Sequence, residues 1–282
     1  MMLPWLPFFL FVVGTCVGSF VNVLVFRSGF TETNASRSHC MACGAALRWY
    51  DLVPVLSFCA LSGRCRECGS ALSIQYPLVE LAVGALFLFS FLILPPVFSF
   101  WSIFAFVALL IFLASFTGLV AYDIRHTLVP LPFVYALITA ALGASVAQSF
   151  SIHSAEPLYD SLLGGAALFG FFMAIVILTR GKGMGSGDAY VAGAIGILLG
   201  FFRGIEAVMF GIWAGALSGL VLLFLSSLSR KIRLFESDAR VTMKTELPLV
   251  PFLAFGTAVA LYTDISPLAA AASVVALFSG HS

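Results

Sequence analysis

Four cysteines in two C-x-x-C pairs form the first group of residues with recognisable chemistry. Cys40-Met-Ala-Cys43 and Cys65-Arg-Glu-Cys68 are separated by 21 residues, and a glycine follows each pair. Thiolates at this spacing converge on one ion from two tight turns, which is typical of a closed, tetrahedral, structural zinc site. A redox dithiol or a disulfide is the alternative, but a reducing cytosol disfavours stable disulfides. We therefore expect structural zinc at Cys40, Cys43, Cys65 and Cys68.

Two aspartates beside apolar runs form the second candidate site. Asp123 ends one run, and Asp188 opens another after a glycine-rich loop that contains Gly185 and Gly187. If the two carboxylates lie close together, one holds a proton while the other acts as general base on a water that attacks a peptide carbonyl. The two glycines, which lack a Cβ, admit an extended substrate close to the backbone. Simpler roles stay open, namely an interfacial partner of Arg125 for Asp123 and a helix cap for Asp188.

The elements that must position these residues are membrane helices. Of 282 residues, 61% are apolar and 10% are charged, and 14 basic and 13 acidic side chains give a net charge of +1. A soluble domain is about half apolar and about a quarter charged, so the composition indicates an integral membrane protein. The near-neutral balance also argues against nucleic-acid binding, which needs clustered positive charge.

Charged residues divide the chain into uncharged runs of membrane-spanning length. They predict an all-α polytopic membrane protein with about eight transmembrane helices, near residues 5–27, 74–94, 97–121, 129–149, 160–179, 188–202, 205–228 and 249–264. The first run has no preceding basic residues and no convincing cleavage pattern, which favours a retained span over a signal peptide. We divide the chain into a first transmembrane helix (1–27), a small cytosolic zinc-binding loop domain (28–73) and a transmembrane domain that carries both aspartates (74–282).

Alternation of these spans predicts the orientation of the chain. Every Lys and Arg except Arg203 then lies on one side. Positive charge marks the cytosolic side, so both termini are expected outside. The same alternation places Asp123 and Asp188 at the cytosolic face, at similar depth. On the outer side, Arg203 and Glu206 are expected to form an ion pair.

Several short motifs follow one another along the chain. They are GSFVNV at 18–23, RSHCMAC at 37–43, WYDLVPVLS at 49–57, GRCREC at 63–68, YPLVE at 76–80, GSGD at 185–188 and PLVPFLAFG at 248–256. Together with Asp123, this ordered set resembles the type IV prepilin peptidases, inner-membrane G-x-G-D aspartic proteases that also act as N-methyltransferases. The family usually carries a Pro-Asp pair shortly after its first acid, where this chain has Pro130-Leu131.

The resemblance implies a reaction and a location. Asp123 and Asp188 would be the catalytic pair, with Gly185 and Gly187 in the loop beside the substrate, and residues 74–282 would be an aspartic peptidase domain. The substrate would be a prepilin or pseudopilin of a type IV pilus or type II secretion system, with a basic leader in the cytosol and a hydrophobic helix in the lipid. Cleavage after a glycine would free an amine, which the enzyme methylates from S-adenosylmethionine. The bacterial inner membrane would hold the protein, with the zinc loop and both acids on the cytoplasmic side.

The methyl-donor site has a weaker signature. No glycine-rich nucleotide loop follows a strand, so any S-adenosylmethionine pocket would lie at the membrane edge around the zinc loop. Candidate residues are Asn22, Asp51, Glu80 and Lys182. Asn22 has a simpler role as an interhelical hydrogen-bonding group, and Asp51 as a local cap. Glu80 would also be favoured at the positive N-terminal end of a helix, and Lys182 would be an ordinary positive charge on the cytosolic side. A carboxylate inside a membrane span is nevertheless costly unless it has a functional role, which favours Glu80 as a candidate.

Three other interpretations are weighed against this one. The chain could be a peptidase without methyltransferase activity, or a non-catalytic assembly factor whose zinc loop docks a partner. An ion or proton transporter is disfavoured because both acids are expected at one interface and not near the midplane. The remaining cysteines, Cys16 and Cys59, have apolar neighbours and are expected to be buried and inert. The sequence predicts no particular oligomeric state.

Overall fold

The computed structural model describes residues 5–27, 39–40, 42–182, 184–231 and 248–267. The chain forms two compact units, Met1–Leu158 and Tyr159–Ser282. Residues 28–38 of the predicted loop domain and residues 232–247 and 268–282 of the predicted transmembrane domain lie outside the described residues.

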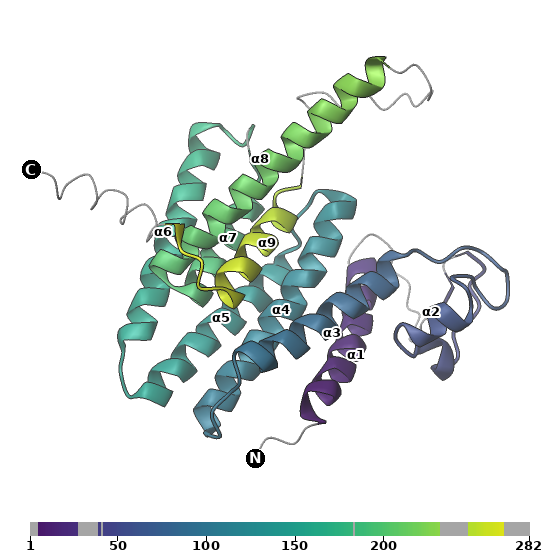
Figure 1. The fold of residues 1–282 in the computed structure, drawn as a ribbon, viewed down its shortest axis with the longest axis horizontal. Helices are drawn as coiled ribbons and strands as arrows, with labels where there is room; N and C mark the ends of the chain where they lie inside the picture. Colours follow the sequence, from purple (N-terminus) through teal and green to yellow (C-terminus); the bar gives the residue numbers. More distant parts are fainter. Residues whose placement is uncertain (1–4, 28–38, 41, 183, 232–247, 268–282) are drawn as a thin grey trace, which may run out of the picture. The chain divides into compact units, whose positions relative to one another are not determined.

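The described residues are helical, with no strand among them and only isolated bridges His39–Ala46 and Arg64–Ala71. The elements, drawn in Figure 1, are α1 (Leu6–Arg27), the 3-10 helix η1 (Trp49–Leu52), α2 (Leu56–Ala60), α3 (Gln75–Ile93), α4 (Phe100–His126), α5 (Leu131–Ile152), α6 (Glu156–Leu178), α7 (Ser186–Leu199), α8 (Phe201–Lys231) and α9 (Val250–Tyr262). Six of them, α1, α3, α4, α5, α6 and α8, are long and apolar enough to cross a membrane, while α7 and α9 are shorter apolar helices. The prediction of an all-α, multi-pass membrane protein is confirmed.

Helix ends follow local chemistry, with one informative shift. α4 was expected to end at residue 121 but continues to His126, so Asp123 lies within its last turn. Arg125 and His126 favour the negative C-terminal end of a helix. Thr127 then ends α4 in the left-handed conformation, at φ 50° and ψ 35°, and its N–H bonds to the Asp123 carbonyl at 2.8 Å.

In the first unit, α1 and α3 pack closely and run antiparallel (Figure 1). Gly14 of α1 lies against Gly84 of α3, and one turn further along Gly18 lies against the Glu80 backbone. A Cβ on Gly18 would come within 2.7 Å of the Glu80 Cα. Small residues let membrane helices approach to this distance, and here they bring the C-terminal half of α1 against the N-terminal half of α3.

In the second unit, glycines serve the same purpose. Gly211 of α8 packs against the Phe252 and Leu253 backbone of α9, and Gly256 of α9 packs against Ala207. Gly196 of α7 lies against Gly164 of α6, also through its backbone. The small-residue spacing along α7 and α8 therefore reflects close helix packing.

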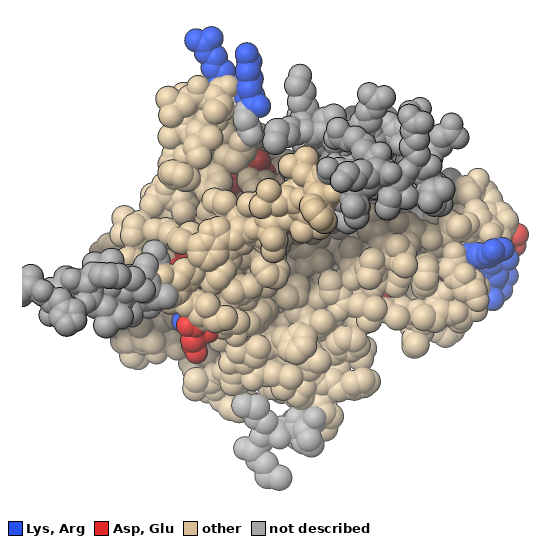
Figure 2. All heavy atoms as spheres, turned by 45° about the horizontal axis from the view of Figure 1, so that its top comes forward, with Lys and Arg blue, Asp and Glu red and all other residues tan. Residues whose placement is uncertain are grey.

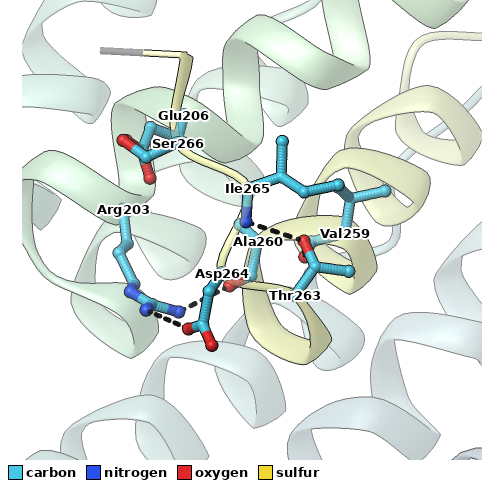
Figure 3. Close-up of polar contacts among 8 residues, drawn as sticks. All are labelled: Arg203, Glu206, Val259, Ala260, Thr263, Asp264, Ile265 and Ser266. Carbon is cyan, nitrogen blue, oxygen red and sulfur yellow. Dashed lines mark hydrogen bonds and ion pairs between the residues drawn. The ribbon is translucent and has the colours of Figure 1, made fainter. Parts of the chain in front are cut away.

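Polar contacts also join the start of α8 to the segment after α9 (Figure 3). Arg203 pairs with Asp264 at 3.2 Å and donates to the Ala260 carbonyl at 3.0 Å. Glu206 is buried and accepts a hydrogen bond from Ser266. The expected Arg203–Glu206 pair was wrong, because the chain beyond α9 folds back onto α8 and supplies a partner for each side chain.

Outside these sites the visible surface is largely uncharged. Figure 2 shows Lys, Arg, Asp and Glu at a few places on a surface dominated by other residues. Phe8, Phe98 and Leu178 are among many large apolar side chains that are more than half exposed. Exposed apolar surface on this scale belongs in lipid, which agrees with a protein of several membrane spans.

Candidate functional site

Each C-x-x-C pair closes a tight turn of the same design. The Cys40 N–H bonds to the Ala45 carbonyl at 2.9 Å, and the Cys40 carbonyl accepts the Gly44 N–H at 2.8 Å. The second pair repeats both bonds around Cys65, with Ser70 and Gly69 as partners. Gly44 and Gly69 have φ of +72° and +71°, which glycine adopts without steric cost. The glycine after each pair is therefore what lets the turn close.

The two turns bring all four sulfur atoms together. The Sγ atoms of Cys40, Cys43, Cys65 and Cys68 lie within 4.8 Å of one another, and those of Cys40 and Cys68 are 4.0 Å apart. Sulfur atoms around a tetrahedral zinc ion, at about 2.3 Å each, are separated by about 3.8 Å. The cluster can therefore bind one metal ion, and all six cysteines of the chain are free of disulfides.

Backbone amides lower the pKa of the Cys40 thiol, which favours the thiolate form that binds a metal ion. Hydrogen bonds from the Cys43 and Ala42 backbone lower the pKa of Cys40 to about 6. The pKa of Cys68 is also lowered, first by its hydrogen bond with the Ser70 hydroxyl. The Ala45 amide favours the Cys43 thiolate, but the nearby Cys68, burial and Cys40 outweigh it and raise its pKa to about 11. Once one of these thiols has lost its proton, its negative charge disfavours a second thiolate nearby. The site therefore favours a bound cation that neutralises several thiolates together.

An ion pair connects the second turn to η1. Asp51 of η1 accepts two hydrogen bonds from Arg66, at 2.8 and 3.1 Å, and its side chain is only 7% exposed. Arg66 lies between Cys65 and Cys68, and its guanidinium also stacks over the Tyr50 ring at 5.1 Å. We call residues 39–73 the cysteine subdomain. Asp51 thus stabilises it from within, a partner for this acid that sequence reasoning did not identify.

Asp123 lies at the end of α4 in the first unit. It is 5% exposed, and its turn is held by neighbouring helices. Gln75 of α3 donates to the Ala121 carbonyl at 3.3 Å, and the Arg125 guanidinium lies over the Phe26 ring of α1 at 4.6 Å. The Phe26 ring stacks in turn on Tyr76. A carboxylate on this turn therefore has a fixed backbone.

Asp188 lies in the second unit, in the first turn of α7. It is half-buried, and Gly185 is the N-cap residue of the helix. The Asp188 N–H bonds to the Gly185 carbonyl at 3.3 Å. An acid in the first turn is favoured by the helix dipole, and the exposed Gly185 leaves the backbone before it uncovered by side chains. The N-cap position itself is held by Gly185, and Asp188 is the third residue of the helix.

The four candidate cofactor residues fall in three places. Asn22 and Glu80 are buried where α1 and α3 meet, at 1% and 7% exposure. The Asn22 amide N–H₂ donates to the Tyr76 carbonyl at 3.0 Å, while its buried Oδ1 accepts no hydrogen bond from any described residue. Asp51 belongs to the cysteine subdomain, and Lys182 is exposed in the second unit.

The two remaining cysteines correct an expectation. Cys16 and Cys59 are exposed, not buried. Cys16 lies in the membrane helix α1, where apolar neighbours face lipid as well as the core, and Cys59 lies in the short helix α2. An apolar context therefore does not by itself predict burial.

Comparison with known proteins places these sites in a family. The Bacterial Peptidase A24 N-terminal domain matches residues 12–94, and the Type IV leader peptidase family matches residues 110–228. A Burkholderia pseudomallei protein named prepilin leader peptidase/N-methyltransferase is 30% identical over 90% of this chain and 84% of its own length. The chain belongs to the type IV leader peptidase family.

Other members of the family are similar over different extents. A Bacillus subtilis protein of the same name is 30% identical over 90% of this chain and 94% of its own length. A Myxococcus xanthus protein, also of that name, is 32% identical over 78% of this chain, but the match spans only 64% of that longer protein. No solved structure matches the chain.

The two matched segments of this leader peptidase family member separate its candidate sites. Residues 12–94 contain the cysteine cluster, Asn22 and Glu80. Residues 110–228 contain Asp123 and Asp188. The cysteine cluster and the two aspartates therefore belong to different segments of the family pattern.

Proposed function

We propose that this protein removes the leader of type IV prepilins or pseudopilins and methylates the new N-terminus. One observation carries the proposal: the segment that matches the leader peptidase family has Asp123 in the last turn of α4 and Asp188 in the first turn of α7. If successive helices alternate across the membrane, the end of α4 and the start of α7 face the same side. Positive-inside charge makes that side cytosolic, in a bacterial inner membrane.

The two acids would act as an aspartic pair. The deprotonated carboxylate takes a proton from water, which attacks the scissile carbonyl carbon, while the protonated carboxylic acid donates its proton to the carbonyl oxygen. Collapse of the tetrahedral intermediate breaks the C–N bond, and the departing nitrogen takes up a proton from the pair. Gly185 and Gly187 lie beside Asp188 without side chains, which leaves space for an extended substrate backbone.

The substrate would reach these acids from within the membrane. A prepilin has a hydrophobic helix that would lie in lipid and a short leader that would lie in the cytosol. The exposed apolar surface of the helices suits the first part, and a cytosolic pair of acids suits the second. We assign no nucleic acid as a partner.

The cysteine cluster would hold zinc in a structural role. Four sulfur ligands close the tetrahedron and leave no position for water or substrate. The metal would then join the two turns of the cysteine subdomain without taking part in the cleavage.

For methyl transfer, S-adenosylmethionine would supply the methyl group. The residues that we propose for its site are Asn22, Asp51, Glu80 and Lys182. The buried Asn22 Oδ1 supports a polar ligand or water here, because a buried acceptor without a hydrogen bond is costly. Asp51 would contribute a carboxylate from η1 of the cysteine subdomain, Glu80 one from α3, and Lys182 a cation at the membrane surface.

The test is the intact mass of a prepilin recovered after co-expression with this protein or with its Asp188→Asn variant. Loss of the leader plus one methyl group, absent with the variant, supports both activities and the role of the acid. Loss of the leader alone supports a peptidase without methyl transfer. An unaltered precursor, from a set of prepilins with matched leaders, contradicts the proposal and favours an assembly role.

A further inference from the structure

Glu80 is the one charged residue of α3 and one of few buried acids in the described chain. It lies in the second turn of a membrane-spanning helix and is 7% exposed. Placing a carboxylate inside a membrane helix is costly unless fixed partners replace its water. Its partners therefore indicate what the chain gains from it.

The Glu80 carboxylate joins three segments of the first unit. Its Oε2 accepts the Val55 backbone N–H at 2.8 Å, from the cysteine subdomain. The Ser19 side chain of α1 also lies close to this carboxylate. The close packing of Gly18 against the Glu80 backbone places α1 directly beside this turn of α3.

Val55 has a backbone that needs such a restraint. Its φ is 61° and its ψ is −49°, which is rare for any residue with a side chain and rarer for a β-branched one. The Leu56 N–H bonds to the Pro54 carbonyl at 2.5 Å across it, so Val55 is the centre of a γ-turn with positive φ. A conformation of this kind persists only where the surroundings hold it.

The γ-turn also lies on a path from the metal ligands to the membrane. Arg66, beside Cys65, pairs with Asp51 in η1. η1 leads directly into the turn at Val55, and Val55 is bound to Glu80. Apart from the chain connection at residue 74, this bond is a direct link between the cysteine subdomain and α3.

We propose that Glu80 is a positioning residue that holds the cysteine subdomain in one fixed placement on α1 and α3, through the Val55 turn. This inference stands on the geometry of the first unit and does not depend on the proposed function. It assigns the Glu80 carboxylate to the attachment of the subdomain, so that Glu80 would affect methyl transfer through the placement of the subdomain.

Three substitutions at Glu80 test this. Glu80→Leu removes the acceptor, Glu80→Asp keeps the charge but withdraws the carboxylate by about 1.5 Å, and Glu80→Gln keeps an acceptor oxygen at the same reach. The control is Glu67→Leu, which removes an exposed acid from the same subdomain. Hydrogen exchange is measured on the full-length protein in detergent, on peptides that cover residues 53–58, together with the zinc content.

We expect the Val55 amide to exchange about tenfold to a hundredfold faster in Glu80→Leu and in Glu80→Asp, since a hydrogen bond to a charged group has been lost. Glu80→Gln should stay within about threefold of the wild type, as should Glu67→Leu. Zinc content should be equal in all five proteins. Unchanged exchange in Glu80→Asp, or loss of protection in Glu80→Gln equal to that in Glu80→Leu, would overturn the proposal.

A functional measurement separates positioning from simple stability. The ratio of methylated to cleaved prepilin is measured for each variant, with all variants expressed at the same level. This second experiment rests on the proposed function, whereas the hydrogen-exchange experiment does not. We expect Glu80→Asp to lower the ratio at least about fivefold and Glu80→Gln to restore it. A wild type that never methylates refutes the methyl-transfer proposal, and the exchange data still decide the role of Glu80.

Discussion

The Cys40 and Cys68 sulfur atoms lie 4.0 Å apart, although they belong to different turns. Neither C-x-x-C pair can complete a tetrahedral site alone, so all four cysteines would be needed to hold one metal ion.

The first prediction concerns this metal. Cys40→Ser or Cys68→Ser should lower the zinc content from about one ion per chain to near zero, because a hydroxyl is a poor replacement for a thiolate ligand. Elemental analysis of the purified protein measures this. Cys59→Ser, at an exposed cysteine outside the cluster, is the matched control and should keep its zinc. A wild type without zinc would contradict the assignment of the metal.

The second prediction concerns the two acids. Asp123→Asn and Asp188→Asn preserve shape and should each reduce leader cleavage by about 10²-fold to 10⁴-fold, since neither amide can transfer the proton. Thermal unfolding in detergent should be nearly unchanged. Glu156→Gln, an exposed acid at the start of α6, should cleave normally. If the Asp variants unfold at lower temperature and still cleave, the two acids are structural and are not the catalytic pair.

Much of this architecture follows from the sequence. Uncharged runs predicted all six helices of the described residues that are long enough to cross a membrane, while the predicted spans 188–202 and 249–264 correspond to the shorter helices α7 and α9. The spacing and following glycines predicted the two cysteine turns. The end of α4 was misplaced because Tyr122 and Asp123 interrupt the apolar run, while the helix ends at the left-handed Thr127. Hydropathy shows only where the apolar residues stop. The helix itself continues as long as its backbone N–H and carbonyl groups form hydrogen bonds within it.

Long-range polar partners were not predictable in this way. Arg203 and Glu206 are three residues apart and were expected to pair, yet the segment after α9 provides Asp264 and Ser266. The Glu80–Val55 bond was missed for the same reason, since nothing in the sequence signals that Val55 adopts a positive φ. Such contacts depend on which distant segments of the chain come together in the fold. Local sequence patterns carry no information about this.

The third prediction tests the approach of α1 and α3. A Cβ at Gly18 would lie 2.7 Å from a backbone atom of Glu80, which cannot move away as a flexible side chain would. Gly18→Ala should destabilise the protein by about 1–3 kcal/mol through this overpacking. Gly170→Ala, where a Cβ meets nothing within 4 Å, should be neutral or slightly stabilising. The measurement is the shift of the unfolding transition in detergent, and equal shifts for the two variants would refute the close approach.

The fourth prediction concerns pH. The hydrogen bonds from Arg66 hold the pKa of Asp51 below its ordinary value. The carboxylate therefore stabilises the cysteine subdomain fully above the ordinary carboxyl pKa, and this contribution is lost as the pH falls through the lowered value. Asp51→Asn should release zinc to a chelator faster than the wild type at neutral pH. The difference between the two proteins should shrink in acid, where protonation of Asp51 makes them alike.

Protonation of the cysteine thiols also releases metal in acid. The rate of zinc release from Asp51→Asn must therefore be compared with that from the wild type at the same pH, and not with the rate of either protein at neutral pH. Glu67→Gln, at an exposed acid of the same subdomain, should follow the wild type throughout. A pH-independent difference between Asp51→Asn and the wild type would show that the Asp51 carboxylate does not act through its charge.

The fifth prediction separates the two bonds of Arg203 at the end of α9. Its ion pair with Asp264 is exposed, at 50% and 101% of the side chains, and exposed pairs contribute at most about 1 kcal/mol. Its second hydrogen bond goes to the Ala260 carbonyl in the last turn of α9. Carbonyl groups in the last turn of a helix have no backbone N–H partner within the helix, so this bond supplies a missing donor. Arg203→Ala should therefore lower the unfolding temperature more than Asp264→Ala does. Added salt should weaken the effect of Asp264→Ala but leave most of the effect of Arg203→Ala. Equal effects of the two variants at every salt concentration would show that the ion pair, and not the carbonyl, holds the start of α8 to the end of α9.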